Sequence, residues 1–153
     1  MNYKFENSIE ILKNKAQCSQ ISYKHAAALI YKENIYSTGF NKFLKVKSFQ
    51  INKEKSIYYK TIHAEINAIC QIPKHLAKGK DILVIRINKN LDLKNSRPCN
   101  HCIEKLLKIG IRKVHYSNEF GIIISEFLSD MEKTHTSAGS MYINNNFQRN
   151  LLK

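Results

Sequence analysis

Two short clusters of residues constrain this chain more than any other feature. The first is His63-Ala64-Glu65, and the second is the run PCNHC at residues 98–102. Neutral imidazole nitrogen and thiolate sulfur are donors that Zn²⁺ prefers, and a catalytic zinc uses three protein ligands with a fourth position left open. His63, Cys99 and Cys102 supply three such ligands. The sequence therefore predicts a zinc site, and a fold that brings two distant segments together.

Each cluster is predicted to open a helix. Apolar residues follow a helical spacing over residues 63–72, and Pro73 ends the pattern. The second helix is expected to carry Pro98 in its first turn and to stop at Gly110, a natural C-terminal residue. Both predicted ligand sets therefore lie at helix starts.

The helix starts have consequences for the chemistry of both clusters. Cys99 and Cys102 are three positions apart, so their sulfurs project to one side of the helix. The helix amides and a metal lower the pKa of a thiol, so we expect both cysteines to bind as thiolates. Glu65 lies in a first turn, where the helix dipole favours an ionised carboxylate. It is the predicted general base and then general acid.

A closed structural zinc site is the rival interpretation. An open catalytic site is favoured because the sequence has no second C-x-x-C or H-x-x-x-H pair, and because a carboxylate follows His63 two residues on. In the closed alternative, the fourth ligand would be His101, His75, His115, Cys70 or Cys18.

The remaining pattern predicts helices and strands in alternation. Residues 81–87 are almost continuously apolar, which indicates a central strand covered on both faces. A short connection with a glycine after residue 116 favours an antiparallel hairpin over a helical crossover. The other expected elements are a helix at 5–16, a hairpin of strands 25–31 and 35–41, strands at 113–116 and 122–124, and a short helix at 125–133.

The charge of the chain leaves a nucleic-acid partner open. The net charge is +13, and residues 42–60, expected to be a long loop, mix lysines with aromatic residues that could stack on bases. A solvated loop is the alternative, since lysines are scattered through the whole chain and arginine is scarce. Arg86 and Arg97 are candidates for binding a substrate phosphate, with surface bracing as the alternative role.

Length and composition favour one globular domain over residues 1–153, with a motif-bearing core at about 24–125. Hydrophobic residues make up 43% of the 153 residues, enough for a core. Only four cysteines are present, which does not suit a secreted disulfide framework. With no apolar signal or membrane-spanning run, the expected location is the cytoplasm, the nucleus being the alternative, and no membrane partner is expected.

The two clusters together resemble the cytidine deaminase superfamily, in particular its CMP/dCMP-type zinc-binding domain. The pattern H-x-E followed by P-C-x-x-C is the signature of zinc deaminases. The resemblance extends from about residue 26 to about residue 124. It includes Gly39-Phe40-Asn41, which is similar to a Gly-x-Asn element whose Asn contacts the substrate in several such enzymes.

This resemblance implies a fold and an activity. The fold is a three-layer α/β/α sandwich with a mixed five-stranded sheet, whose last strand is expected to be antiparallel. The activity is hydrolytic deamination of a cytosine nucleoside or nucleotide to its uracil form, with Zn²⁺ as cofactor, Glu65 as proton shuttle and ammonia as product. Substrate contacts are expected from Asn41, from the backbone carbonyl of Arg97 and from the backbone amide of Ala64, with the amide of Cys99 as the alternative to that of Ala64.

The resemblance also implies a homo-oligomer, and it leaves other functions open. One alternative is a deaminase that acts on bases in RNA or single-stranded DNA. Arg97 stands directly before Pro98 where adenosine deaminases of nucleic acids typically have Glu, which disfavours adenosine as the base. Another alternative is a zinc-stabilised binding module without catalysis.

Overall fold

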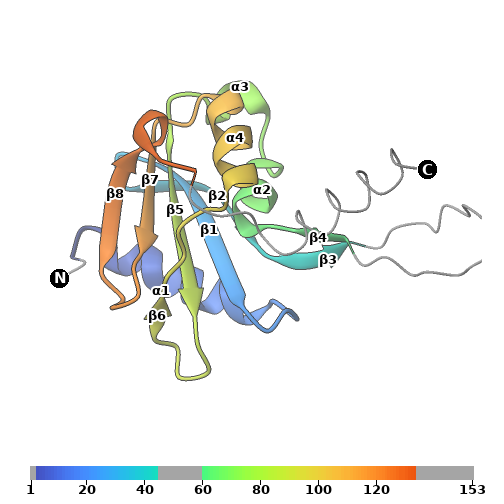
Figure 1. The fold of residues 1–153 in the computed structure, drawn as a ribbon, viewed down its shortest axis with the longest axis vertical. Helices are drawn as coiled ribbons and strands as arrows, with labels where there is room; N and C mark the ends of the chain where they lie inside the picture. Colours follow the sequence, from blue (N-terminus) through green and yellow to red (C-terminus); the bar gives the residue numbers. More distant parts are fainter. Residues whose placement is uncertain (1–2, 45–59, 134–153) are drawn as a thin grey trace, which may run out of the picture.

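A computed structural model describes residues 3–44 and 60–133 of the chain, and Figure 1 shows their fold. The expected segments that fall at 45–59 and 134–153 lie outside the described residues. They comprise most of the lysine-rich segment and the C-terminal tail. Both predicted clusters fall within the described part.

The centre of the fold is a six-stranded mixed sheet with β5 in its middle. The main order of strands is β2-β1-β5-β7-β8, and short β6 pairs with the end of β5. Only β5 and β7 are parallel among the described pairs of this sheet, and β8 is antiparallel to β7 as expected. The strands are β1 (Lys24–Tyr31), β2 (Asn34–Phe40), β5 (Asp81–Ile87), β6 (Leu93–Lys94), β7 (Lys113–Ser117) and β8 (Ile123–Phe127).

Helices cover both faces of this sheet, which confirms the three-layer α/β/α prediction (Figure 1). A 3₁₀ turn, η1 (Tyr3–Phe5), leads into α1 (Glu6–Gln17), which packs on one face. The opposite face carries α2 (Ala64–Ile69), α3 (Lys74–Ala77) and α4 (Asn100–Ile109).

Strand alternation sorts the side chains of each strand into two cores. Leu83 and Ile85 of β5 pack with Leu12 of α1, whereas Val84 between them packs with Ala68 of α2 and Leu106 of α4. The prediction that residues 81–87 form a strand buried on both faces is therefore confirmed.

The predicted helix at 125–133 is wrong. After the turn at Gly121, the chain pairs with β7 residue by residue until Phe127 reaches Lys113, and only the 3₁₀ turn η2 (Leu128–Asp130) follows. The pairing satisfies the backbone hydrogen-bonding groups of β8 that face β7, and this contact decides the structure of residues 123–127.

Other boundaries also differ from the expectation, and the helix expected at 63–72 ends already at Ile69. The segment 42–60 begins and ends in strands, because β3 (Lys42–Leu44) pairs antiparallel with β4 (Lys60–Ile62). Residues 88–97 include the short strand β6. Pro98 lies before α4 and not in its first turn, since Cys99 is the N-cap residue of that helix.

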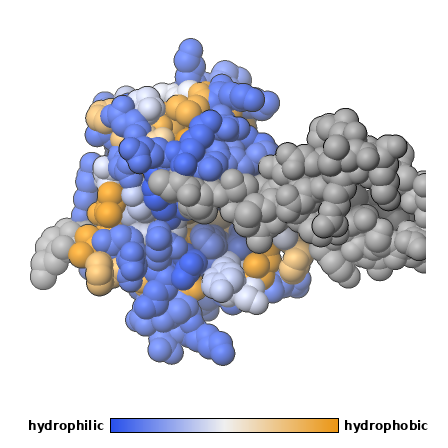
Figure 2. Space-filling model, in the orientation of Figure 1, coloured by the Kyte–Doolittle hydropathy of each residue, from blue (hydrophilic) through white to orange (hydrophobic). Residues whose placement is uncertain are grey.

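The surface seen in Figure 2 is largely hydrophilic, with hydrophobic residues scattered over it in small groups. Among the described helices, none is both long and apolar enough to cross a membrane.

Candidate metal centre

The two predicted clusters meet at the N-termini of α2 and α4. His63 is the N-cap residue of α2 and Cys99 that of α4, and both have extended backbone angles, with φ and ψ of −74° and 154° for His63 and −73° and 163° for Cys99. Neither side chain makes a capping hydrogen bond to its helix. Both side chains therefore leave the helix ends and turn toward each other.

The arrangement of the three donors fits a zinc ion. The ligand atoms of His63, Cys99 and Cys102 all lie within 4.8 Å of one another. The Nδ1 atom of His63 is 3.5 Å from the sulfur of Cys99 and 3.2 Å from that of Cys102. A tetrahedral zinc with bonds of about 2.3 Å to sulfur and about 2.0 Å to nitrogen places these atoms about 3.5 Å apart. The three residues thus match the ion in donor type and in spacing.

The pKa values of the three donor side chains are shifted in different directions. The hydrogen bond from Cys102 lowers the pKa of Cys99 to about 3, against the opposing effect of burial and with help from His63. The hydrogen bond to Cys99, together with burial, raises the pKa of Cys102. Without a metal ion the proton of the pair therefore stays on Cys102. The expectation of two thiolates concerns the metal-bound site, where an ion would displace that proton, and it stays a prediction. The pKa of His63 is raised, chiefly by its hydrogen bond with Cys99.

Glu65 is buried in the first turn of α2, with a relative exposure of 5%. Burial raises the pKa of its carboxyl group and outweighs the attraction of His63. Burial thus acts against the helix dipole on this carboxyl group, because desolvation disfavours its charged form. A carboxyl group with a raised pKa is suited to hold and return a proton.

No fourth histidine, cysteine or carboxylate joins the three ligands within residues 3–44 and 60–133. Cys18 and Cys70 are exposed. His115 lies on the face of the sheet that carries α1, where its Nδ1 is 2.6 Å from Oγ of Ser125 and its ring stacks on Phe5. In the described part of the chain, the geometry favours the open site over the closed one.

The position of α2 depends on a close approach to β2. A Cβ atom at Gly39 would lie 2.3 Å from the backbone nitrogen of Ala68, so no side chain fits there. Ser37 Oγ donates to the carbonyl of Ala68 at 2.8 Å, and the amide of Phe40 donates to Oδ1 of Asn67 at 3.1 Å. These contacts fix the helix that carries Glu65.

Sequence reasoning missed Asn67 and Ser37 as positioning residues. Asn67 is buried although its side chain is polar, and it stands one helical turn after His63. A polar residue on the buried side of a short helix was the available signal for this contact.

A buried serine holds the segment that leads to the second cluster. Ser96 Oγ donates to the carbonyl of Val84 at 2.8 Å and accepts from the amide of Ser117 at 2.9 Å. The amide of Ser96 also donates to the carbonyl of Ser117 at 2.8 Å. The strands β5 and β7 thus fix the approach to Pro98 and Cys99.

The other predicted site residues lie around the cluster. Asn41 follows β2, and its Oδ1 accepts from the amide of His25 at 2.9 Å while its Nδ2 donates to the carbonyl of Tyr23 at 2.7 Å. Ala64 is the first residue of α2 and is fully buried. Arg97 donates from Nη2 to the backbone carbonyl of Glu132 at 2.7 Å, which is the bracing role considered above. Their contacts with a substrate stay predictions.

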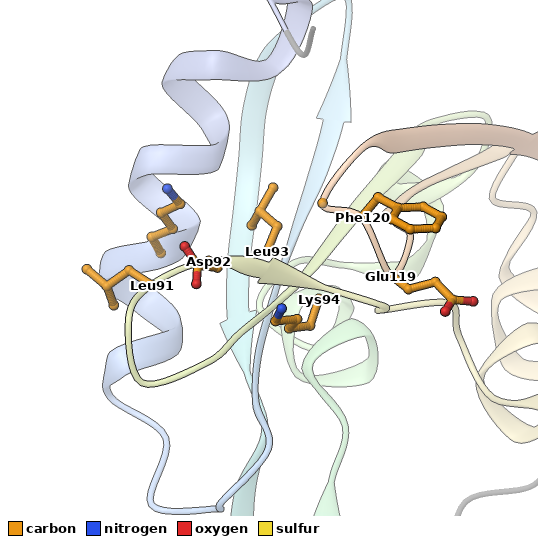
Figure 3. A pocket seen from close by; sticks show the side chains of 8 residues that line it. Leu91, Asp92, Leu93, Lys94, Glu119 and Phe120 are labelled. Carbon is orange, nitrogen blue, oxygen red and sulfur yellow. The ribbon is translucent and has the colours of Figure 1, made fainter.

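A surface hollow of about 490 Å³ lies beside β6 and the β7–β8 turn (Figure 3). It is lined by the turn before β6, by β6 itself, by the β7–β8 turn and by Lys13 of α1. Phe120 at its edge is 83% exposed. None of the three metal-site residues lines this hollow, whereas Lys94 of β6 does.

Comparison with known families places the His63–Glu65 and Pro98–Cys102 clusters in a described zinc-binding region. The model of the cytidine and deoxycytidylate deaminase zinc-binding region matches residues 3–118, which include both clusters and the strands that position them. No curated protein sequence matches this chain significantly.

Solved structures confirm the fold. The dCMP deaminase of cyanophage S-TIM5, in complex with dCMP and dUMP, is 20% identical with a TM-score of 0.55. That match covers 80% of this chain and 86% of the phage chain. The cytidine deaminase of Burkholderia pseudomallei is 18% identical with a TM-score of 0.55, over 86% of this chain and 98% of the bacterial one. At these identities the similarity shows a shared fold.

Proposed function

Because this chain belongs to the cytidine and deoxycytidylate deaminase family, we propose that it is a zinc-dependent hydrolase of cytosine nucleosides or nucleotides. One observation carries the proposal: three zinc-type donor atoms lie within 4.8 Å of one another, and Glu65 is buried two residues after one of them. The reaction consumes one water, breaks the bond between C4 and the exocyclic amine, and yields the uracil form and ammonia.

Zn²⁺, when bound, would supply a Lewis acid that makes water a nucleophile near neutral pH. His63, Cys99 and Cys102 would hold it, and two thiolates balance the charge of the ion. The proton moves through Glu65, which takes it from the attacking water, delivers it to N3 of the ring and then carries a second proton to the leaving amine. Its buried position keeps bulk water from exchanging that proton.

The substrate would be oriented by groups at the edge of the metal centre. The backbone amide of Ala64 and the backbone carbonyl of Arg97 are proposed to bind the carbonyl and amino groups of the base. The side chain of Asn41 is proposed to bind the sugar. Its two hydrogen bonds to the backbone use one N–H and one lone pair, and an amide group has a second of each to offer.

The experiment that tests this function is a screen for ammonia release. Zinc-loaded protein is assayed with cytidine, deoxycytidine, CMP, dCMP and cytosine-containing oligonucleotides, beside a Glu65→Gln variant. We expect turnover of at least one substrate, lost by about 10²- to 10⁴-fold in the variant. Zinc content is measured in both proteins, because a variant that retains zinc separates a lost proton shuttle from a lost metal site.

Two outcomes would contradict the proposal. Full activity in Glu65→Gln would remove the assigned role of this carboxyl group. Zinc-loaded, folded protein that is inactive on every substrate would instead favour the zinc-stabilised binding module.

A further inference from the structure

The register of the strands places four polar residues in one row across the sheet. His25 of β1 lies opposite Arg86 of β5, and Arg86 lies opposite Lys94 of β6. On the other side of His25, the amide of Asn41 donates to the carbonyl of His25 at 3.3 Å. Residues directly opposite one another in a sheet project from the same face, so the four side chains form a row.

This row lies on the face of the sheet that carries the metal centre. Two positions along from His25 and Arg86, Ala27 and Val84 pack in the core beneath α2 and α4. The side chain of Lys94 projects from this face as well. Its neighbour Leu93 packs on the opposite face, the side of α1, and Figure 3 shows the side chains of Leu93 and Lys94 leaving β6 in opposite directions.

The row runs outward from the metal centre. His25 lies near enough to His63 and Cys99 for their charges to act on its imidazole, and the charge of Arg86 acts on it as well. Asn41 and His25 therefore form the inner end of the row. Arg86 and Lys94 form the outer end, one and two strand spacings of about 4.8 Å beyond His25.

The outer end carries two adjacent cations without a carboxylate partner. In the described part of the chain, the ion pairs involve Lys13, Arg112, His115 and Lys133, and neither Arg86 nor Lys94 takes part. Like charges placed directly opposite each other destabilise a sheet through their repulsion. An anion bound between Arg86 and Lys94 would offset this repulsion.

Two neighbouring cationic side chains donate hydrogen bonds to backbone carbonyls, in contrast to Arg86 and Lys94. Lys24 donates through Nζ to the backbone carbonyls of Gln17 and Ser19, and Arg97 donates to that of Glu132. The guanidinium of Arg86 instead lies 5.2 Å from the ring centroid of Tyr23, whose side chain is 66% exposed. Stacking leaves the edge of a guanidinium, with its N–H groups, available for hydrogen bonding.

We propose that Arg86 and Lys94 form a phosphate subsite that makes this enzyme prefer a phosphorylated substrate over a nucleoside. The inference rests on the proposed deaminase function, since the base would occupy the metal centre and the sugar the space beside Asn41 and His25. Arg86 would bind two phosphate oxygens through its N–H groups, and Lys94 would add a second charge. The phosphate could belong to a mononucleotide or to the backbone of a single strand.

The test compares each nucleotide with its own nucleoside. We expect Arg86→Gln to lower kcat/KM for dCMP or CMP about 10- to 100-fold, while kcat/KM for deoxycytidine or cytidine changes less than about twofold. Lys94→Gln should act in the same direction with a smaller effect, and Arg86→Lys should restore part of the loss. Lys89→Gln is the matched control, because it removes one exposed positive charge from the β5–β6 turn outside the row.

Several outcomes would overturn the subsite. Equal losses for nucleoside and nucleotide would show a structural role for Arg86, as would a lowered melting temperature that accounts for the change. Equal activity of the unaltered protein on both members of a pair would also reject it. A loss confined to oligonucleotides would retain the subsite and assign it to a backbone phosphate.

Binding measurements keep this inference separate from the proposed function. If no substrate is deaminated, the function fails, and calorimetry with zinc-loaded protein then compares dCMP with deoxycytidine. Tighter binding of dCMP that is lost in Arg86→Gln supports the subsite without turnover. Equal affinity for the two ligands rejects it.

Discussion

Replacement of Gly39 by alanine is the sharpest test of how the candidate site is positioned. The added Cβ would lie 2.3 Å from the nitrogen of Ala68, 2.7 Å from the carbonyl carbon of Asn67 and 2.8 Å from the oxygen of Ala64. All three are backbone atoms of α2, so no side-chain rotation relieves the contact. Ordinary contacts between such atoms are about 3.5 Å, and α2 must therefore move away from β2 by about 1 Å.

This displacement has a cost in stability and a cost in activity. Overpacking costs about 1–3 kcal/mol, and the two hydrogen bonds from Ser37 and Phe40 to α2 are each worth about 0.5–1.5 kcal/mol if they stretch beyond use. We expect a total loss of about 2–6 kcal/mol in the free energy of unfolding. Because α2 carries His63 and Glu65, a shift of about 1 Å should also lower kcat/KM by about 100-fold.

The assay measures ammonia release per folded, zinc-loaded molecule beside thermal unfolding. Gly79→Ala is the matched control: its φ of 77° strains an alanine, yet nothing lies within 4 Å of the new Cβ. The control should lose about 1–2 kcal/mol of stability and keep its activity per folded molecule. If Gly39→Ala retains both stability and kcat/KM, the close approach of β2 does not position α2, and the reasoning is refuted.

Three further predictions concern the ligands and the sheet. Ser96→Ala should cost about 1–3 kcal/mol, because it removes the bond to Val84 and leaves the amide of Ser117 without its acceptor, and zinc competition should show weaker binding. An unchanged melting temperature would contradict it. Cys102→Ser should lose bound zinc and activity by elemental analysis and assay, whereas Cys18→Ser, at an exposed position, should keep both. Burial raises the pKa of Asp81, but the bonds from Arg112 and His115 outweigh it and hold that pKa below the ordinary 3.8. The ionised carboxylate thus stabilises the fold above pH 3.8, and the stabilisation is lost as the pH falls through the lower folded pKa. The difference in melting temperature between the protein and Asp81→Asn should shrink from about pH 7 to about pH 3, and a constant difference would count against this coupling.

The sequence predicted the local patterns well and the contacts between them less well. The spacing of the metal ligands and the alternation of buried faces along the strands could be predicted, because both depend on positions that are close in the sequence. The buried face of α2 could not be predicted in the same way. Among the apolar residues whose spacing predicts a helix at 63–72, Cys70 is exposed and Ile66 is only half-buried. Ala64 and Ala68 are fully buried instead, because the strand that contains Gly39 approaches too closely for larger side chains.

Two other features of the chain depend on tertiary structure. Residues 125–127 were assigned to a helix, but their structure depends on pairing with β7, a partner that local propensity does not reveal. The expectation for Glu65 considered the helix end alone, whereas the burial that raises the pKa of its carboxyl group follows from packing. Arg86 and Arg97 were equivalent candidates in the sequence, and only the structure distinguishes the braced arginine from the stacked one.

A zinc ion bound at the N-cap positions of α2 and α4 would connect the folding of this protein to its supply of metal. A residue that caps a helix through its side chain contributes about 1 kcal/mol, and His63 and Cys99 hold these positions without such a bond. An ion bound by both side chains would join two helix starts that are far apart in the sequence. The proportion of folded chains should therefore follow the free zinc concentration, so that metal scarcity would reduce the amount of protein as well as its activity.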